Sequence, residues 1–180
     1  MFLTEESFFS AADQYRNKEG TRYWGDAKRR WGYHKRSIEI IKQVSLGTPR
    51  ILEIGTMGIP LSSESDLLDM ALHKDFYSRK DLRYEHDLRC IPWPIEDRIY
   101  DWVVALRVYH HLWPMQRECF EEALRIGRNL ILFVPAVKNH EVKQGTILPS
   151  EFRAWYSDIR PSIIEPMAEF GFLYAWIREK

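Results

Sequence analysis

The chain has 180 residues, of which 45% are hydrophobic and 29% are charged, which suits one folded domain and excludes a disordered tail. Its formal net charge is zero, so no global electrostatic attraction draws it to a nucleic acid or to an anionic membrane. Two cysteines without CxxC spacing, and the lack of a signal peptide or a bilayer-length apolar run, favour a cytoplasmic protein with no membrane partner.

Two helices are predicted at the start of the chain. Thr4 and the two glutamates after it form a helix start, and helical spacing of apolar residues continues to about residue 18. Gly20 and Gly25 interrupt the pattern. A second helix is predicted over residues 26–44, with its apolar side toward the core.

The segment 21–36 is the strongest local concentration of positive charge. It mixes basic side chains, among them Lys28, Arg29, Arg30, Lys35 and Arg36, with the aromatic residues Tyr23, Trp24, Trp31 and Tyr33. Such a segment can bind phosphate or stack on nucleobases. It can equally be an amphipathic helix with a solvated basic face, and the zero net charge of the chain favours this second interpretation.

A short buried strand is predicted over residues 51–54, where three of the four side chains are aliphatic. Gly55 and Gly58 follow it and let the backbone turn sharply and approach a ligand where a Cβ would clash. The pattern is typical of the start of a nucleotide-binding α/β domain. A plain turn between a strand and a loop has the same residues, so the motif alone leaves both interpretations open.

The next segment is predicted to form a helix and then a strand. Ser63 with Asp66 has the spacing of a helix cap, so a helix is expected over residues 63–72. Alternating apolar residues predict a strand over residues 82–88, and the proline-rich residues 90–94 close it.

The second half of the chain predicts two further buried strands and a helix between them. The strands are expected over residues 100–106 and 129–136, and the helix from Trp113–Pro114 to Gly127. Strands that are apolar on both faces and alternate with helices indicate a parallel sheet covered on both sides. This makes an α/β fold the expected class.

The last forty residues change in character. Pro149 begins a short helix, and Gly171 separates two apolar runs that favour strands. We expect an antiparallel hairpin that turns near Gly171. A helix followed by one strand is the alternative, because Pro166 and the spacing of Met167 and Phe170 also suit a helix.

Three features fall in one order along the chain: the glycine turn after residues 51–54, Asp87 at the end of a strand, and the strand 100–106 that leads to two histidines. With them, residues 50–136 resemble the class I S-adenosylmethionine-dependent methyltransferases. The run from His86 to Leu112 carries most of the resemblance, with its Pro-aromatic pair, Asp-initiated strand and His-His-Leu ending. The resemblance implies a Rossmann-like fold, with a mostly parallel sheet and helices on both faces, and S-adenosylmethionine (SAM) as cofactor.

The resemblance also implies the residues that bind the cofactor. The first motif holds its methionine end and ribose, an acidic-apolar pair flanks its adenine, and a strand end lines its methionyl group. These positions are Glu53, Gly55, Thr56 and Gly58, then Asp87 and Leu88, and then Ala105 and Leu106.

Further residues are expected to face the acceptor. Arg107 to His111 follow the strand that lines the methyl group, with Arg107 and Tyr109 as acceptor contacts. His110 and His111 are candidates for the base that removes a proton from the acceptor, because histidine titrates near neutral pH. Packing is the alternative role for both. Consecutive histidines without a third ligand nearby do not predict a metal site.

Residues 1–46 resemble a helical lid that selects the acceptor in this family, over a Rossmann-like core at residues 47–180 of a single domain. Tyr23, Trp24 and Tyr33 would then contact the acceptor.

The chain departs from the family pattern at two places. Met57 occupies the position of the middle glycine in the first motif. The segment from Gly58 to Asp87 is too short for two strands and two helices, so one element, for instance the second strand, is expected to be degenerate. Asp75 has the spacing of the acid that binds ribose, although a solvated loop position is the favoured interpretation.

The predicted function is therefore methyl transfer from SAM to a small molecule or a glycan, most readily at oxygen. No Asn/Asp-Pro-Pro-aromatic motif is present, which disfavours a nucleic-acid base as acceptor. The alternative is a protein that keeps the fold without catalysis and acts as a binding or scaffolding partner. The sequence predicts no oligomeric state.

Overall fold

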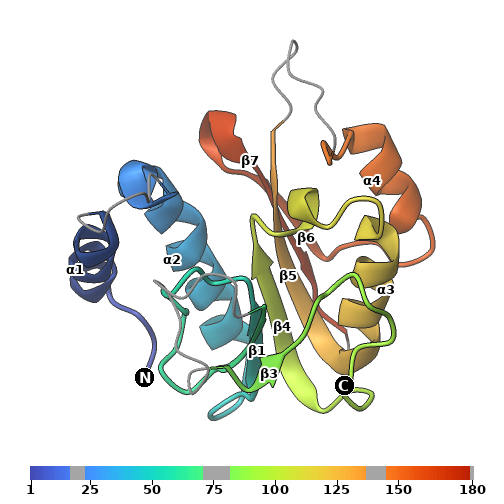
Figure 1. Ribbon diagram of the computed structural model, residues 1–180, viewed down its shortest axis with the longest axis horizontal. Helices are drawn as coiled ribbons and strands as arrows, with labels where there is room; N and C mark the ends of the chain where they lie inside the picture. Colours follow the sequence, from blue (N-terminus) through green and yellow to red (C-terminus); the bar gives the residue numbers. More distant parts are fainter. Residues whose placement is uncertain (17–22, 71–81, 137–144, 179–180) are drawn as a thin grey trace.

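The structure is a computed structural model that describes residues 1–16, 23–70, 82–136 and 145–178 (Figure 1). Its helices are α1 (Glu5–Arg16), α2 (Ala27–Val44), α3 (Gln116–Ile126) and α4 (Pro149–Trp155), with short 3₁₀ turns η1 (Tyr23–Asp26), η2 (Tyr109–His111) and η3 (Ala168–Phe170). Its strands are β1 (Ile51–Ile54), β2 (Asp66–Asp69), β3 (Tyr84–Glu85), β4 (Tyr100–Leu106), β5 (Gly127–Pro135), β6 (Ile163–Pro166) and β7 (Gly171–Trp176).

The strands form one sheet in the order β3–β2–β1–β4–β5–β7–β6. The pairs from β3 to β5 are parallel, and β7 pairs antiparallel with both β5 and β6. The predicted α/β class, with a mostly parallel sheet and a C-terminal antiparallel hairpin, is confirmed. The alternative of a helix followed by one strand is not formed, because β6 pairs with β7 along its whole length.

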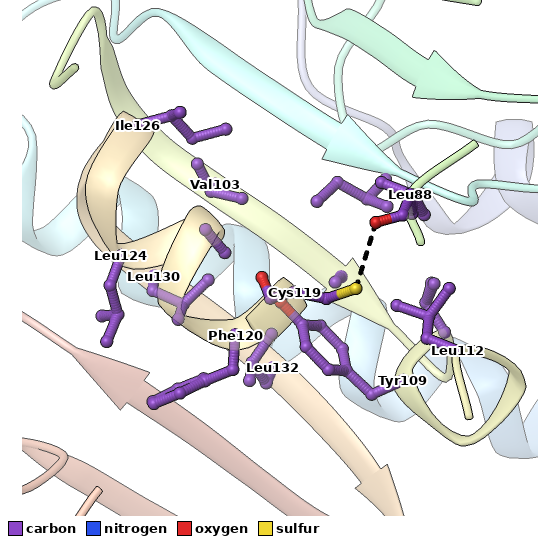
Figure 2. Close-up of a cluster of buried hydrophobic side chains, with 14 of the residues drawn as sticks. Leu88, Val103, Tyr109, Leu112, Cys119, Phe120, Leu124, Ile126, Leu130 and Leu132 are labelled. Carbon is purple, nitrogen blue, oxygen red and sulfur yellow. Dashed lines mark hydrogen bonds between the residues drawn. The ribbon is translucent and has the colours of Figure 1, made fainter. Parts of the chain in front are cut away.

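Helices cover both faces of the sheet, with α1 and α2 on one side and α3 and α4 on the other (Figure 1). Successive side chains of β4 point to opposite faces, as a strand requires. Trp102 and Val104 pack in the cluster that includes Tyr33 of α2, whereas Val103 packs with Phe120 of α3 (Figure 2). Each helix is therefore fixed by the apolar face that it buries.

The predicted helix over residues 63–72 is wrong, because β2 occupies Asp66–Asp69. Leu67 and Leu68 are buried, and β2 lies between β1 and β3 and pairs in parallel with both. The local capping pattern is thus overridden by pairing in the sheet. One element was expected to be missing between Gly58 and Asp87. It is the helix between β1 and β2, because residues 55–65, which form this crossover, contain no helix. The second strand itself is present.

Glu53 in β1 holds this crossover in place. Its side chain is buried, and its carboxylate accepts the backbone N–H of Leu61 at 2.8 Å and of Ser62 at 3.2 Å. A loop that lacks helical hydrogen bonds must satisfy its buried N–H groups in another way, and Glu53 does so. Burial outweighs these hydrogen bonds and raises the pKa of Glu53 to about 7.

Within the described ranges, no helix combines the length and the apolar character that crossing a membrane requires.

Candidate functional site

A cavity of about 430 Å³ lies at the carboxyl ends of the parallel strands. Ligand sites in proteins span about 300–1,000 Å³, and open α/β sheets bind ligands at this edge. In Figure 1 it is the upper end of the sheet, toward which the arrows of β4 and β5 point. The strands β1, β2, β3 and β4 each contribute residues from their carboxyl end or from the loop that follows. The lining residues are Gly55, Met57, Asp69, Met70, Asp87, Leu88, Arg89, Arg107, Val108, His111 and Leu112.

The structure brings together five of the residues predicted for the site. Gly55, Asp87, Leu88, Arg107 and His111 all line the 430 Å³ cavity, although their sequence positions span more than fifty residues.

The other five predicted cofactor residues are not among those that line this cavity. Glu53, Thr56 and Leu106 line a second cavity of only about 10 Å³, which shares Gly55 with the first. Gly58 lines neither of the two, and Ala105 is buried within β4. Glu53 was predicted to hold the cofactor, but its carboxylate is engaged by the loop after β1. Its role in this structure is to support the crossover.

Gly55 needs to be glycine for two reasons. Its φ is +63°, and a Cβ at this position would lie 2.8 Å from Cγ2 of Val108. Gly58 has a φ of +83°, and Met57 between them has a φ of +49°. The loop thus keeps the left-handed turns of a glycine motif, and it holds a non-glycine residue in one of them at a cost in strain.

The N-terminal helical segments hold this loop through its carbonyl groups. The Trp24 indole N–H donates to the Met57 carbonyl at 3.2 Å, and the Tyr15 hydroxyl donates to the Gly58 carbonyl at 3.3 Å. Trp24 is only 1% exposed, and Tyr33 is 2% exposed and stacks on Phe133 at 4.3 Å. Both were predicted to contact an acceptor, and their burial gives them packing roles instead. The side chain of Tyr23 lies outside the described part of the structure.

Within residues 24–36, some basic side chains of the segment 21–36 contact the rest of the protein more closely than predicted. Arg36 makes a bidentate ion pair with Glu165 at 2.6–2.7 Å, Arg29 lies over the Phe170 ring at 4.7 Å, and Arg30 is buried. The segment thus lies largely on an amphipathic helix, but its basic face is only partly solvated, because Arg30 is buried and Arg36 is half-buried.

Asp87 and Leu88 form the wall of the cavity after β3. Asp87 accepts the backbone N–H of Arg89 at 3.0 Å and two guanidinium N–H groups at 2.9–3.0 Å. These hydrogen bonds from Arg89 lower the pKa of Asp87, so the carboxylate stays charged. The Leu88 carbonyl accepts the indole N–H of Trp93 at 2.8 Å and the thiol of Cys119 at 3.1 Å, which ties this wall to α3 (Figure 2).

Asp69 is a lining residue that the sequence analysis missed. It ends β2, and its Oδ1 accepts the Met70 backbone N–H at 2.7 Å. An acid at the end of the second strand is the position that binds ribose hydroxyls in dinucleotide folds. The prediction for Asp75 lies outside the described residues. One feature of the sequence could have indicated Asp69. The segment from Gly58 to Asp87 is short, and where the helix after β1 is missing, the second strand ends at an earlier position in the sequence.

The two histidines after β4 differ in environment. His111 is exposed and lines the cavity, whereas Nδ1 of His110 is buried with no hydrogen-bond partner among the described residues. Burial, and then the positive charges of His111, Arg107 and Arg30, lower the pKa of His110 to about 3. Tyr109, predicted to contact the acceptor, is 2% exposed and donates its hydroxyl to the Cys119 carbonyl at 3.1 Å, so it packs in the core (Figure 2).

His34 gives the fold a measurable pH dependence. Its ring is buried beside the 10 Å³ cavity, with Nδ1 2.8 Å from the Arg30 carbonyl, and burial lowers its pKa to about 4. A lowered folded-state pKa means that its contribution to stability is complete above the unfolded value of 6.5 and is lost as the pH falls to 4.

We therefore predict that the free energy of unfolding of the wild type falls relative to that of His34→Phe by about 3 kcal/mol between neutral pH and the pKa of His34. Urea unfolding of both proteins across this range measures the difference. A difference that stays constant with pH would contradict the buried neutral imidazole.

The fold is similar to solved SAM-dependent methyltransferases. One from Aquifex aeolicus has a TM-score of 0.53 at 13% identity, over 76% of this chain and 86% of that one. Magnesium protoporphyrin IX methyltransferase from Synechocystis PCC 6803, solved with bound SAM, has a TM-score of 0.54 at 12% identity, over 95% and 91%. A protein from Pyrococcus horikoshii OT3 has a TM-score of 0.63 at 11% identity, over 93% and 99%.

No protein-family model and no curated protein sequence matches the chain. The structural likeness stands without a sequence match, and it agrees with the strand order and with the cavity at the carboxyl edge. The chain therefore has the class I, Rossmann-like fold of the SAM-dependent methyltransferases.

Proposed function

We propose that this protein is a SAM-dependent methyltransferase that methylates an oxygen of a small molecule or a glycan. The observation that carries the proposal is the convergence of Gly55, Asp69 and Asp87, from the ends of three neighbouring strands, on one 430 Å³ cavity. The cavity has the size and the position of a nucleotide site in an open α/β sheet. Titration with SAM, described in the Discussion, is the experiment that tests it.

The lining residues fit this cofactor. Gly55 lines the cavity without a Cβ, which would lie only 2.8 Å from Cγ2 of Val108, another lining residue. Asp69 would accept the ribose hydroxyls and Asp87 the adenine amino group, because a carboxylate that already binds Arg89 still has free lone pairs. Leu88 would cover a face of the adenine ring. When bound, SAM supplies a methyl group on a sulfonium centre.

The acceptor side of the cavity is proposed to lie at Arg107 and His111. Methyl transfer is a displacement that needs alignment of the two partners more than a protein nucleophile. A hydroxyl acceptor must lose its proton, and an exposed imidazole at the cavity suits this task. His110 suits it less, because a pKa of about 3 makes its ring a weak base. An unchanged methylation rate in His111→Ala would remove His111 from this role.

Asp69 provides a prediction that the resemblance alone did not make. In Asp69→Asn one acceptor oxygen and the negative charge are lost, so affinity for S-adenosylhomocysteine (SAH) should fall about tenfold. Isothermal titration measures the change. Asp66→Asn is the matched control, since Asp66 lies at the other end of β2, where it accepts the Tyr100 hydroxyl at 2.6 Å. Equal losses in both variants would mean that Asp69 supports β2 and does not contact the ligand.

A protein that keeps the fold without catalysis is the second candidate. The left-handed Met57 in the glycine loop and the crossover without a helix are the observations that favour it. Both change the part of the fold that would hold the methionine end of the cofactor. Failure to bind SAM or SAH would favour this candidate.

A further inference from the structure

A second cavity lies at the opposite end of the sheet, where the parallel strands begin. Its volume is about 890 Å³. It is lined by the end of α2 and the loop that follows, by the loop before β4, by residues near the start of β4 and β5, and by Arg178, two residues after β7. This is the lower end of the sheet in Figure 1, near the label C. The methyltransferase proposal makes no use of it, because the two cavities share none of the described residues that line them.

Three arginines from separate segments meet at this cavity. They are Arg98, Arg128 and Arg178, and among the described residues Asp101 is the only carboxylate that lines the cavity with them. Asp101 accepts the backbone N–H of Arg50 at 2.9 Å and lies 3.6 Å from Arg128. Within the described ranges, Arg98 and Arg178 pair with no carboxylate. The lining groups thus carry two positive charges in excess.

The backbone holds Arg98 and Arg178 in this arrangement. Arg98 has a φ of +54°, and its N–H donates to the Arg125 carbonyl at 3.0 Å. The Arg178 N–H donates to Oδ1 of Asn129 at 3.0 Å. Partial burial, and then the charge of Arg98, lower the pKa of Arg178, as expected where two cations lie near each other without an anion.

The other side of the cavity is apolar. It includes Val44 and Pro49, the buried ring of Trp102, and Leu46, whose side chain is 84% exposed. α2 ends here at Val44, and the carbonyl groups at a helix C-terminus repel an anion. An anionic group is therefore favoured on the Arg98 side, and an apolar group is favoured beside Leu46.

We propose that this cavity binds a small phosphate monoester with an apolar body, the phosphate lying between Arg98 and Arg178 and the apolar body against Leu46. A phosphate dianion matches the excess of two positive charges, and guanidinium groups bind phosphate with charge-assisted hydrogen bonds. The volume of about 890 Å³ accommodates a ligand of this kind. The zero net charge of the whole chain favours a small ligand over a nucleic acid.

The test is isothermal titration of the full chain with 1-naphthyl phosphate as the probe. The wild type should bind it with a Kd below about 1 mM. Arg98→Gln/Arg178→Gln should weaken binding by about tenfold or more. The control Arg117→Gln/Arg160→Gln removes the same charge from exposed positions outside the cavity and should leave binding unchanged.

Three outcomes would overturn the proposal: no binding of the probe to the wild type, equal binding of 1-naphthol, or equal losses in the two double variants. A single-stranded oligonucleotide that binds much more tightly than the probe, and that loses affinity in Arg98→Gln/Arg178→Gln, would replace the small ligand with a nucleic acid. Thermal unfolding of each variant checks that it folds. Binding of SAH at the opposite edge is measured separately, so failure of either site is recognised independently.

Discussion

Replacing Gly55 by arginine should abolish binding of SAH, with a loss of affinity of about a hundredfold or more. Gly55 lines the 430 Å³ cavity at the end of β1, and even a Cβ there would lie 2.8 Å from Val108. Because Val108 also lines the cavity, an arginine at position 55 would displace Val108 or enter the space that the cofactor would occupy, and either change disrupts the site. Isothermal titration of the folded variant measures the loss.

Backbone strain is a competing cause that the control must exclude. Gly47 has a φ of +80°, similar to Gly55, but a Cβ there meets no atom within 4 Å. Gly47→Arg therefore introduces the same side chain and similar strain outside the cavity. It should lose some stability and keep its affinity for SAH. If a folded Gly55→Arg protein bound SAH as tightly as Gly47→Arg, the cavity would not be the cofactor site.

Replacing Glu53 by alanine should lower the free energy of unfolding by about 3 kcal/mol near pH 5. The reason is that the buried N–H groups of Leu61 and Ser62 lose their acceptor. The folded-state pKa of Glu53 is raised from 4.5 to about 7, so its stabilising contribution is greatest at low pH and declines as the pH rises through 7. The loss on substitution should thus shrink toward pH 8.

Urea unfolding at both pH values measures this effect. Glu64→Ala is the matched control, because Glu64 lies in the same crossover with a side chain that is 64% exposed and forms an ion pair with the exposed N-terminal amino group. Its loss should be below about 0.5 kcal/mol at either pH. Equal losses at Glu53 and Glu64 would show that the crossover does not depend on the buried carboxyl group.

The parts of the fold that the sequence predicted well are those with a strong local pattern. The helical spacing of apolar residues in α2 predicts an amphipathic helix, and the apolar runs of β4 and β5 predict strands of a parallel sheet that is covered on both faces. β2 was missed because its residues also suit a helix, and only pairing with β1 and β3 decides between the two. Such pairing joins distant parts of the chain and leaves no local signal.

The same limit applies to the candidate site. Gly55, Asp87 and Leu88 were predicted to contact the cofactor, and they do line one cavity, because their motifs follow strand ends. Asp69 was missed together with β2. Glu53 matched the first motif, but which backbone groups surround its carboxylate depends on the path of residues 55–65, and a motif does not encode that path.

The aromatic residues near the N-terminus show a different difficulty. Trp24 and Tyr33 lie in a segment rich in lysine and arginine, which indicates an exposed surface. In the structure Arg36 pairs with an acid and Arg30 is buried against the Trp24 ring, while the aromatic rings of Trp24 and Tyr33 fill the interior between the helices and the sheet. Sequence composition alone does not show which side of an amphipathic helix an aromatic ring occupies.

The central claim is that the cavity at the carboxyl edge binds SAM, and isothermal titration of the purified chain with SAM and SAH tests it most directly. We expect micromolar binding of at least one of them, on the order of −8 kcal/mol, with a rise in melting temperature in the same solution. Absence of binding to a protein that unfolds cooperatively would contradict the claim. It would leave a methyltransferase fold that serves another purpose.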